Sequence, residues 1–386
     1  PGPGMMDLEL SEAQRAARDT ARRFARERLT AVGVEVDRNH SFPAEAIAEL
    51  GRLGMMGIFI PEQYGGAGLD HVSYSLVIEE LGVECSSTAV ILSAHSSLAS
   101  WPILGLGNED QRKRYLPKMA AAEWIGCFAL TEPQAGSDAA GQRTRAVRDG
   151  DSYVINGTKN FITNGPQAGV AIVFANTDPA MGHRGISAFI AETSDPGYQV
   201  VRIEEKMGIR GSHSAQLAFS DLRVPATNLI GKEGDGFKVA MKTLDGGRIG
   251  IASQAIGIAR ASLEASLRYS QERKSFGKPI ANYQAIQWKL ADMAVEIDAA
   301  RLLTHRAATL KDAGLPCTTQ SAMAKLFAAE TAMKAATEAI QVHGGYGYTK
   351  EFKVERYFRD AKITEIYEGT SEIQRLIISS HVLEDR

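Results

Sequence analysis

Cysteine is scarce in this sequence, and the motifs in which cysteine and histidine commonly bind metals are absent. The three cysteines, Cys85, Cys127 and Cys317, lie far apart and are odd in number, so no disulfide framework is expected. Neither CxxC nor HExxH occurs, which disfavours a zinc site, and we expect no bound metal. A reducing compartment fits this cysteine usage best.

The chain also lacks a large net charge and a long apolar run. Its formal net charge is −3, so no strong field is available to hold nucleic acid, although local basic clusters could still bind phosphates. No uninterrupted apolar stretch approaches the ~18 residues of a membrane span. The 386 residues are 44% hydrophobic and 23% charged, which is ordinary globular composition. This length suggests two or three domains of ~100–200 residues.

Two nucleotide-binding motifs are missing as well. No G-x-G-x-x-G occurs, which disfavours a Rossmann dinucleotide site, and no P-loop occurs either. Any nucleotide cofactor must therefore be held in another way. Residues 1–4 (PGPG), ahead of two methionines, resemble a cloning remnant and are set aside.

The first ~120 residues carry helical patterns. Ser11 to Gln14 resembles a capping box ahead of a basic helix. Pro43 stands early in a second helix, where its missing N–H does no harm. Residues 61–70 are too glycine-rich for a helix and predict a loop.

From about Trp124 to Ile230 the pattern is that of strands. Short apolar runs are separated by glycine and proline, and Asp149-Gly150 and Asn156-Gly157 are hairpin-type turn signals. These features predict a small β barrel or sandwich.

From Gly236 onward the pattern is helical again. Apolar residues recur every three or four positions along 249–263 and 286–303, so each set forms one stripe on a long helix. Two further helices are predicted at about 318–342 and 371–383. Four helices with short connections indicate an antiparallel bundle.

The predicted fold is therefore an α+β multidomain arrangement. We expect an N-terminal α-helical domain at residues 6–123, a middle β domain at 124–234, and a C-terminal helical bundle domain at 235–386.

Two segments of the β region carry polar groups at the ends of strands. Phe128–Asp138 (FALTEPQAGSD) runs from a strand into a loop whose N–H groups and hydroxyls suit phosphate or a flavin edge, although a plain strand and turn is the alternative. Phe161–Gly165 (FITNG) places the Thr163 hydroxyl just before a tight turn, and the turn alone could explain its Asn-Gly pair.

Two further segments lie at helix ends. The segment Glu272–Lys278 (ERKSFGK) has two interpretations. Its cations could simply complement the helix dipole, or Arg273 could bind a phosphate through two parallel hydrogen bonds. Gln341–Gly347 (QVHGGYG) contains a glycine pair that could be only a C-cap.

The last segment, Ile366–Glu372 (IYEGTSE), precedes the final helix. Ser371 with Gln374 makes a plausible capping box for that helix. Glu368 lies just ahead of the helix N-terminus, where favourable charge–dipole placement would explain a lone glutamate.

In this order and spacing, the segments FALTEP-GSD, FITNG, ERKSFGK and IYEGT resemble those of the acyl-CoA dehydrogenase family. The likeness covers residues from about 6 to 384 and is greatest for the short-chain (butyryl) and short-branched-chain members. It implies the α–β–α fold, and a homotetramer with one FAD per subunit.

The resemblance also implies roles for individual residues. Thr131 and Thr163 would contact the isoalloxazine edge, Ser137 the pyrophosphate, and Phe161 and Ile162 would pack beside the flavin. The adenosine diphosphate half would be held across a subunit interface. The implied cofactor-binding residues are Phe128, Ala129, Leu130, Thr131, Gly136, Ser137, Phe161, Ile162, Thr163, Arg273, Phe276, Gln284, Gln341, Val342, His343, Gly344, Gly345, Thr370, Ser371 and Glu372. The implied substrate-binding residues are Ser137, Asp245, Arg248, Tyr367 and Gly369.

For a member of this family, Glu368 is the expected catalytic base. The α-hydrogen of a thioester is weakly acidic, so its removal needs a base, and the developing carbonyl charge needs hydrogen-bond donors. Flavin N5 accepts the β-hydride, which no side chain can do. A minority of members place the base at the position matching Gly247, where glycine cannot act. Burial would raise the pKa of Glu368 and the helix N-terminus would lower it, and the sequence leaves open which effect prevails.

The resemblance favours butyryl-CoA as substrate, with isobutyryl-CoA and 2-methylbutyryl-CoA next, in fatty acid β-oxidation or branched-chain amino acid catabolism. In the glutaryl-CoA branch of the family, an arginine near the segment matching residues 85–101 binds the second carboxylate of the substrate. His95 is the only basic side chain in this segment here, so a dicarboxylate substrate is not expected. An electron-transferring flavoprotein would accept the electrons, although Phe161 replaces a tryptophan found in many members. A cytoplasmic bacterial enzyme or a mature mitochondrial matrix chain is expected. The alternatives are an acyl-CoA oxidase and a non-catalytic binding subunit on this fold.

Overall fold

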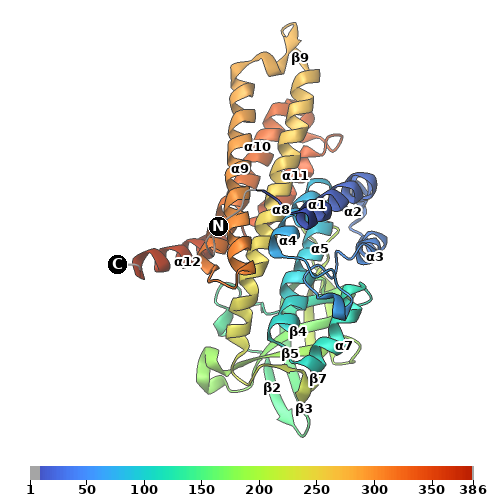
Figure 1. Ribbon diagram of the computed structural model, residues 1–386, viewed down its shortest axis with the longest axis vertical. Coiled ribbons are helices and arrows are strands. Elements are labelled where there is room, and N and C mark those ends of the chain that lie inside the picture. Colours follow the sequence, from blue (N-terminus) through green and yellow to red (C-terminus); the bar gives the residue numbers. More distant parts are fainter. Residues whose placement is uncertain (1–8, 385–386) are drawn as a thin grey trace.

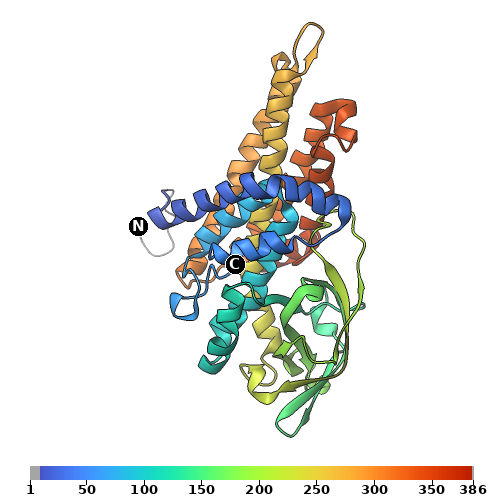
Figure 2. The same cartoon turned by 90° about the vertical axis from the view of Figure 1, so that its right-hand side faces the viewer.

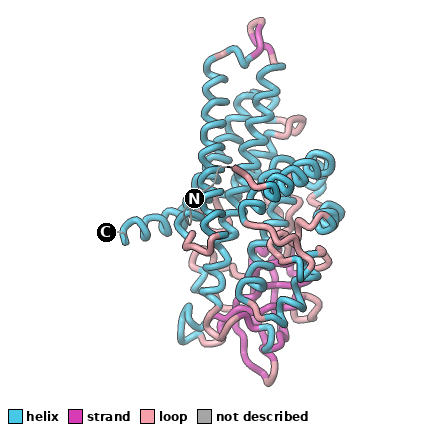
Figure 3. Tube along the Cα trace, viewed as in Figure 1, coloured by secondary structure: helices cyan, strands magenta, loops and turns pink. Residues whose placement is uncertain are grey.

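The computed structural model describes residues 9–384, and residues 1–4, the suspected remnant, lie outside that range. Helices fill the N-terminal and C-terminal thirds of the chain, and strands gather at one end of the molecule (Figure 3). A small hairpin, β9 (Lys274–Ser275) with β10 (Lys278–Pro279), lies at the opposite end.

The N-terminal part is helical, as predicted. The capping box is confirmed, since the Gln14 N–H donates to Ser11 Oγ and the Ser11 N–H donates to Gln14 Oε1. The loop at 61–70 is confirmed apart from one short 3₁₀ turn, Glu62–Tyr64. The helices are α1 (Glu12–Phe24), α2 (Thr30–Asn39), α3 (Ala44–Arg52), α4 (His71–Glu84), α5 (Ser86–Ser93), α6 (Trp101–Leu106) and α7 (Glu109–Ala120).

Residues Ser86–Leu106 form a helical run of 21 residues with a mean hydropathy of 1.4, long and apolar enough to cross a membrane. The run includes the π-helical stretch Ala94–Ser100 and is mostly buried between the helices and the β sheet. Burial of this kind is what the core helix of a globular protein shows. Its serines explain why the sequence reads as an interrupted apolar stretch.

The middle part is a mixed sheet of eight strands in the order β6-β7-β3-β2-β4-β5-β8, with β1 parallel to β4. The sheet curls around its own apolar core, but β6 and β8 end it without pairing to each other, so it is open and not a closed barrel. The strands are β1 (Ile125–Ala129), β2 (Arg145–Asp149), β3 (Ser152–Thr163), β4 (Ala168–Asn176), β5 (Ile186–Glu192), β6 (Tyr198–Ile203), β7 (Ser214–Pro225) and β8 (Leu229–Ile230).

One of the two predicted turns is wrong. Asp149-Gly150 does connect β2 to β3, with Gly150 at φ +60°. Asn156-Gly157, however, lies inside β3, where the pairing with β7 slips between Ile155 and Gly157. A Cβ at Gly157 would overlap Thr144 Oγ1, so the glycine serves a bulge with close backbone approach and not a turn.

The C-terminal part is a helical bundle. Its first helix, α8 (Gly236–Glu272), contains 37 residues and, at about 1.5 Å per residue, extends ~55 Å from the sheet to the β9–β10 hairpin (Figure 1). The remaining helices are α9 (Gln284–Asp312), α10 (Thr318–His343), α11 (Val354–Thr364) and α12 (Ser371–Glu384).

The predicted final helix, α12, exists, but it does not lie alongside the other helices of the bundle. α12 projects sideways from the bundle, and α11, which the apolar pattern did not reveal, packs against α8 and α10 (Figures 1 and 2). α11 has only 11 residues, and the charged side chains of Arg356, Arg359 and Asp360 bond to neighbouring elements, so apolar residues alone do not mark its inner face.

Polar contacts tie α11 to the other two parts of the chain. Both guanidinium Nη atoms of Arg359 donate to Asp37 on α2, at 2.8 and 2.7 Å. The Ile209 N–H, in the loop between β6 and β7, donates to buried Asp360 at 2.5 Å. The segment that follows α11 is therefore anchored by residues from all three parts.

Candidate active site

The segment between α11 and α12 carries the predicted base in an unusual backbone conformation. Glu368 has φ +52° and Gly369 has φ +90°, both in the left-handed region. Only Gly369 has no Cβ to oppose this, so Glu368 adopts a strained conformation that its surroundings must hold in place.

Three side-chain hydrogen bonds hold the carbonyl oxygens of this turn. Gln374 Nε2 donates to Glu368 O at 3.3 Å and to Gly369 O at 2.9 Å. Lys325 Nζ, from α10, donates to Gly369 O at 2.7 Å. The turn is thus fixed from both α10 and α12.

The cap of α12 differs from the predicted one. Thr370 Oγ1 accepts the N–H of Ile373 at 3.3 Å, so Thr370 is the N-cap. Ser371 is the first residue of the helix, and its buried hydroxyl has no partner among the described residues. Gln374 is the residue that the capping box required, but its amide binds the carbonyls of 368 and 369 instead.

The Glu368 carboxyl group is poised to exchange a proton near neutral pH. Its Oε2 atom is buried and makes no hydrogen bond with any described residue. Burial raises the pKa of Glu368 to about 7, against the opposing charges of Lys325 and Arg248. The direction of the pKa shift, which the sequence left open, is therefore upward, because burial outweighs the two nearby positive charges.

Helix α8 forms the wall facing this carboxyl group. A Cβ at Gly247 would overlap Glu368 Oε2 and would lie 2.8 Å from Leu98 Cδ2. Further along α8, a Cβ at Gly250 would overlap the hydroxyl of Tyr74. Two glycines therefore leave the space that the carboxyl group and its neighbours occupy.

The predicted substrate-binding residues on α8 and beside the base come together. Arg248 Nη1 donates to Asp245 at 2.9 Å, and Thr318 Oγ1 donates to the other Asp245 oxygen at 2.9 Å. Arg248 is buried, and its Nε has no partner among the described residues. The Tyr367 hydroxyl bonds Gln254 on the same helix. Ser137 is the exception, since it lies on the loop after β1.

The predicted cofactor residues of the β region also come together. The Asn160 N–H donates to Thr131 O at 2.8 Å, which places Thr131 beside the end of β3, where Phe161 to Thr163 lie. Phe161 is 62% exposed with φ +57°, while Ile162 is buried. Gly136 and Ser137 are exposed, and nothing lies within 4 Å of a Cβ built at Gly136.

A buried ion pair, which the sequence did not suggest, fixes these two segments to each other. Lys159 Nζ donates to Glu132 at 2.9 Å and to the carbonyl of Leu130 at 3.0 Å. The other donors to Glu132 include the N–H groups of Arg143 and Thr144. Although burial acts in the opposite direction, these partners lower the pKa of Glu132 to about 2.

Thr370, Ser371 and Glu372 lie just after Glu368 at the start of α12. The remaining predicted cofactor residues lie far from the β region within one chain. They cluster around the β9–β10 hairpin and the end of α10, opposite the β sheet (Figure 1). Most are exposed: Arg273, Phe276, Gln284, Gln341, Gly344 and Gly345. Val342 and His343 are buried, and the His343 ring stacks on Tyr269 at 4.2 Å. Gly344 is the C-cap of α10, as the glycine pair allowed, and its cofactor role stays a prediction.

The donor set suits a flavin nucleotide better than a metal ion. Hydroxyls, open backbone and an exposed aromatic ring at the ends of β1 and β3 match the edge and face of a fused ring system. Arginine and glycines at the bundle end match a pyrophosphate. Within residues 9–384, no group of three or more His, Cys, Asp or Glu side chains is arranged to hold a metal.

Lys325, Gln374 and Glu132 were missed at the level of sequence. Lys325 did carry a signal, because a lysine within the alanine-rich buried stripe of α10 cannot be explained by packing. Gln374 was assigned to a cap, which is its common role.

Three family models match the chain. They are the acyl-CoA dehydrogenase N-terminal domain over residues 11–123, the middle domain over 127–222 and the C-terminal domain over 234–383. A short-chain specific acyl-CoA dehydrogenase of Clostridium acetobutylicum is 50% identical over 377 residues, which is 98% of this chain and 100% of that protein.

Solved structures agree with these matches. Butyryl-CoA dehydrogenase from Megasphaera elsdenii superposes with a TM-score of 0.96 and 46% identity, covering 98% of this chain and 100% of that one. A chain in a structure of the electron transferring flavoprotein of Acidaminococcus fermentans has a TM-score of 0.97 and 49% identity, again over 98% and 100%.

Proposed function

The chain belongs to the acyl-CoA dehydrogenase family, and from that premise we propose that it oxidises short-chain acyl-CoA thioesters with Glu368 as the base. It is an oxidoreductase, and FAD is its cofactor. The observation that carries the assignment of the base is the Glu368 carboxyl group, buried, unpaired at Oε2 and with a pKa of about 7. A base with a pKa near the working pH combines a useful ionised fraction with strong proton affinity.

In this proposal each group near Glu368 has a defined task. Glu368 removes the α-proton, and its own N–H, at the head of the α12 turn, donates to the thioester carbonyl oxygen. Arg248 and Asp245 hold the coenzyme A arm, and Tyr367 with Gly369 line the acyl site. FAD, when bound, supplies the hydride acceptor that no side chain provides.

The cofactor would be held by two separated sets of residues. Phe128 to Thr131, Gly136, Ser137 and Phe161 to Thr163 would hold the flavin half, with Thr370 to Glu372 beside it. The set at the bundle end would hold the adenosine diphosphate half. Because one chain keeps the two sets apart, the second set must come from a neighbouring subunit.

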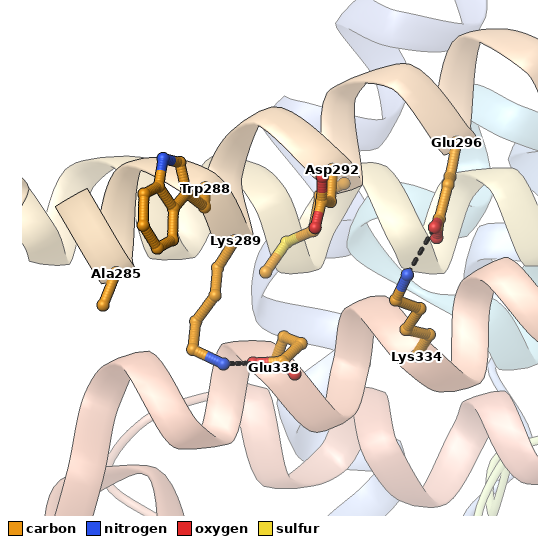
Figure 4. A pocket seen from close by; sticks show the side chains of 8 residues that line it. Ala285, Trp288, Lys289, Asp292, Glu296, Lys334 and Glu338 are labelled. Carbon is orange, nitrogen blue, oxygen red and sulfur yellow. Dashed lines mark hydrogen bonds and ion pairs between the residues drawn. The ribbon is translucent and has the colours of Figure 1, made fainter.

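The exposed surface of the bundle supports assembly into a homotetramer. Phe276 is 96% exposed, and on α9 Trp288 is 63% and Val295 69% exposed, which is costly on a free surface. A groove between α9 and α10 includes Trp288 and is bordered by the Lys289–Glu338 and Lys334–Glu296 ion pairs (Figure 4). An apolar surface with a charged rim is typical of subunit interfaces.

A short, uncharged acyl chain is the proposed substrate, with butyryl-CoA first and isobutyryl-CoA and 2-methylbutyryl-CoA next. The two named relatives are described as short-chain specific and as a butyryl-CoA dehydrogenase. His95, the one basic side chain considered for a second carboxylate, is buried and accepts the Gly126 N–H at 3.0 Å. Burial lowers the pKa of His95 to about 4, so it is neutral and unsuited to a dicarboxylate.

We further propose that an electron-transferring flavoprotein accepts the electrons, in line with the structural match to a chain in such a structure. We also propose that the domains divide at residues 6–123, 124–234 and 235–386. An acyl-CoA oxidase would instead produce peroxide, and one peroxide per turnover would replace the proposal with that activity.

The test compares Glu368→Gln with the matched variant Glu365→Gln. Glu365 lies in the same segment but pairs with Lys362 at 2.6 Å on the surface. Both are assayed with C4 to C16 and branched acyl-CoA substrates and a dye acceptor. Glu368→Gln should retain FAD and bind thioester but lose about 10²–10⁴-fold in kcat. Near-normal turnover in this variant would refute the assignment of the base.

A further inference from the structure

Lys325 is buried in a place where an ammonium group is costly. It lies on the inward face of α10, is 0% exposed and has only alanine-rich neighbours along that face. No carboxylate oxygen of residues 9–384 lies within 4 Å of its Nζ, so no direct ion pair offsets the burial. Its hydrogen bond goes to the carbonyl oxygen of Gly369, the residue after the base.

This hydrogen bond acts on the strained part of the active site. Gly369 O accepts from both Lys325 and Gln374, and the two donors approach from different helices. The peptide they hold follows directly on Glu368, whose φ of +52° is unfavourable for a residue with a Cβ. Without the two donors, Glu368 is free to relax toward an ordinary conformation and to move its carboxyl group.

The charge of Lys325 also acts on the base. Lys325 is the first of the two cations that oppose the burial effect on the Glu368 pKa. Burial lowers the pKa of Lys325 itself to about 8, so it is largely protonated at neutral pH. The charged or titratable groups that influence Glu368 or Lys325 come from every neighbouring element: Arg248 on α8, Tyr74 on α4, Tyr367 in the same segment, Glu365 before it and Glu372 on α12.

We propose that Lys325 is a positioning residue for the base, which pins the carbonyl of Gly369 and holds a buried positive charge facing the Glu368 carboxyl group. The inference rests on the proposed role of Glu368. It gives Lys325 two separable effects, one through its hydrogen bond and one through its charge. A lysine kept only for packing would have neither.

Three substitutions separate the two effects. Lys325→Arg keeps the charge and a donor, Lys325→Gln keeps a donor alone, and Lys325→Met keeps neither. Lys113→Met, on α7 and paired with Glu109 on the surface, is the control, because it lies outside the proposed site and the proposed subunit interface. All variants are prepared as FAD-loaded enzyme. Both kcat and kcat/KM for butyryl-CoA are measured against pH.

Loss of the charge should move the acid limb of the pH profile upward by about one to three units, since a nearby cation lowers a carboxyl pKa by that amount. This shift is expected in Lys325→Gln and Lys325→Met, but not in Lys325→Arg or Lys113→Met. Loss of the donor should lower the high-pH plateau of kcat as well, in Lys325→Met only. An unchanged acid limb in Lys325→Gln would overturn the proposal, and so would an equal loss of rate at every pH in all three variants.

A second readout does not depend on turnover. The protonated carboxyl of Glu368 is identified in the infrared difference between wild type and Glu368→Gln, and its titration is followed in Lys325→Gln without substrate. The titration should shift upward together with the acid limb. If Lys325→Met does not fold, the glutamine and arginine variants still decide the matter.

The two proposals fail in different ways. If Glu368→Gln turns over normally, the role of the base is wrong, whatever Lys325 does. If Glu368→Gln is inactive while the carboxyl titration in Lys325→Gln is unmoved, only the role of Lys325 is wrong.

Discussion

Gly247→Ala should damage catalysis through a single added methyl group. A Cβ at this position lies 3.1 Å from Glu368 Cδ, overlaps Oε2 and lies 2.8 Å from Leu98 Cδ2. Carbon atoms in favourable contact are about 3.5–4.0 Å apart, so the carboxyl group must retreat by roughly 0.5–1 Å. α8 cannot easily shift away, because three residues further on its backbone at Gly250 is packed so closely against Tyr74 that not even a Cβ would fit.

A displacement of this size has a calculable cost. A misplacement of about 1 Å in a reacting group can reduce the rate by about 10²-fold, which corresponds to ~2.7 kcal/mol of transition-state stabilisation. The effect should fall on kcat, since Asp245 and Arg248, the proposed substrate-binding residues, keep their places. Alanine is a better helix former than glycine by about 1 kcal/mol, so a general loss of stability is not expected.

Gly246→Ala is the matched control. It makes the same change one residue earlier in the same helix, where the nearest atom to the new Cβ is Lys311 Cε at 3.2 Å, at the end of a flexible side chain. Steady-state kinetics with butyryl-CoA, FAD content and thermal unfolding are compared for the two variants. A kcat for Gly247→Ala within threefold of the kcat of Gly246→Ala would refute the steric argument.

Two further outcomes are expected. Glu132→Gln or Lys159→Met alone should destabilise the protein by about 3–5 kcal/mol and lower its FAD content, because each leaves a buried charge unpaired. The double variant should recover most of the lost stability. A thermal unfolding temperature that is equally low in the double variant would contradict this. Phe276→Asp should shift the mass measured by light scattering below that of wild type and reduce FAD retention, whereas Met181→Asp, at a residue 46% exposed on the β region, should change neither; an unchanged mass for Phe276→Asp would remove the hairpin from the interface.

The order of helices and strands was predictable from sequence because it depends on local periodicity. Capping at Ser11, the turn at Asp149-Gly150 and the C-cap at Gly344 each follow from the chemistry of a few adjacent residues. The bulge at Gly157 was not predictable, because it depends on the close approach of Thr144, which lies just before β2. α11 was missed because its polar side chains serve Asp37 and Ile209, which are remote in sequence.

In the candidate site, too, some features follow from adjacent residues and others only from the fold. Glu368 could be selected because its segment is distinctive, but its pKa depends on burial and on the charges of Lys325 and Arg248, which only the fold brings near. Thr370 and Ser371 are equally suitable caps by composition, and the backbone decides between them. The sequence therefore supports the choice of Glu368 as the proposed base, whereas the burial and charges that set its pKa depend on the fold.

The contact between Asp37 and Arg359 makes the enzyme vulnerable far from its chemistry. Because α2 anchors α11, the helix that leads into the segment with Glu368, a substitution at Asp37 should lower the turnover rate. FAD content and thioester affinity should stay normal. Variant surveys that rank risk by closeness to Glu368 along the chain would pass over it. The position of the proposed base thus depends on a contact made by a helix more than 300 residues earlier in the chain.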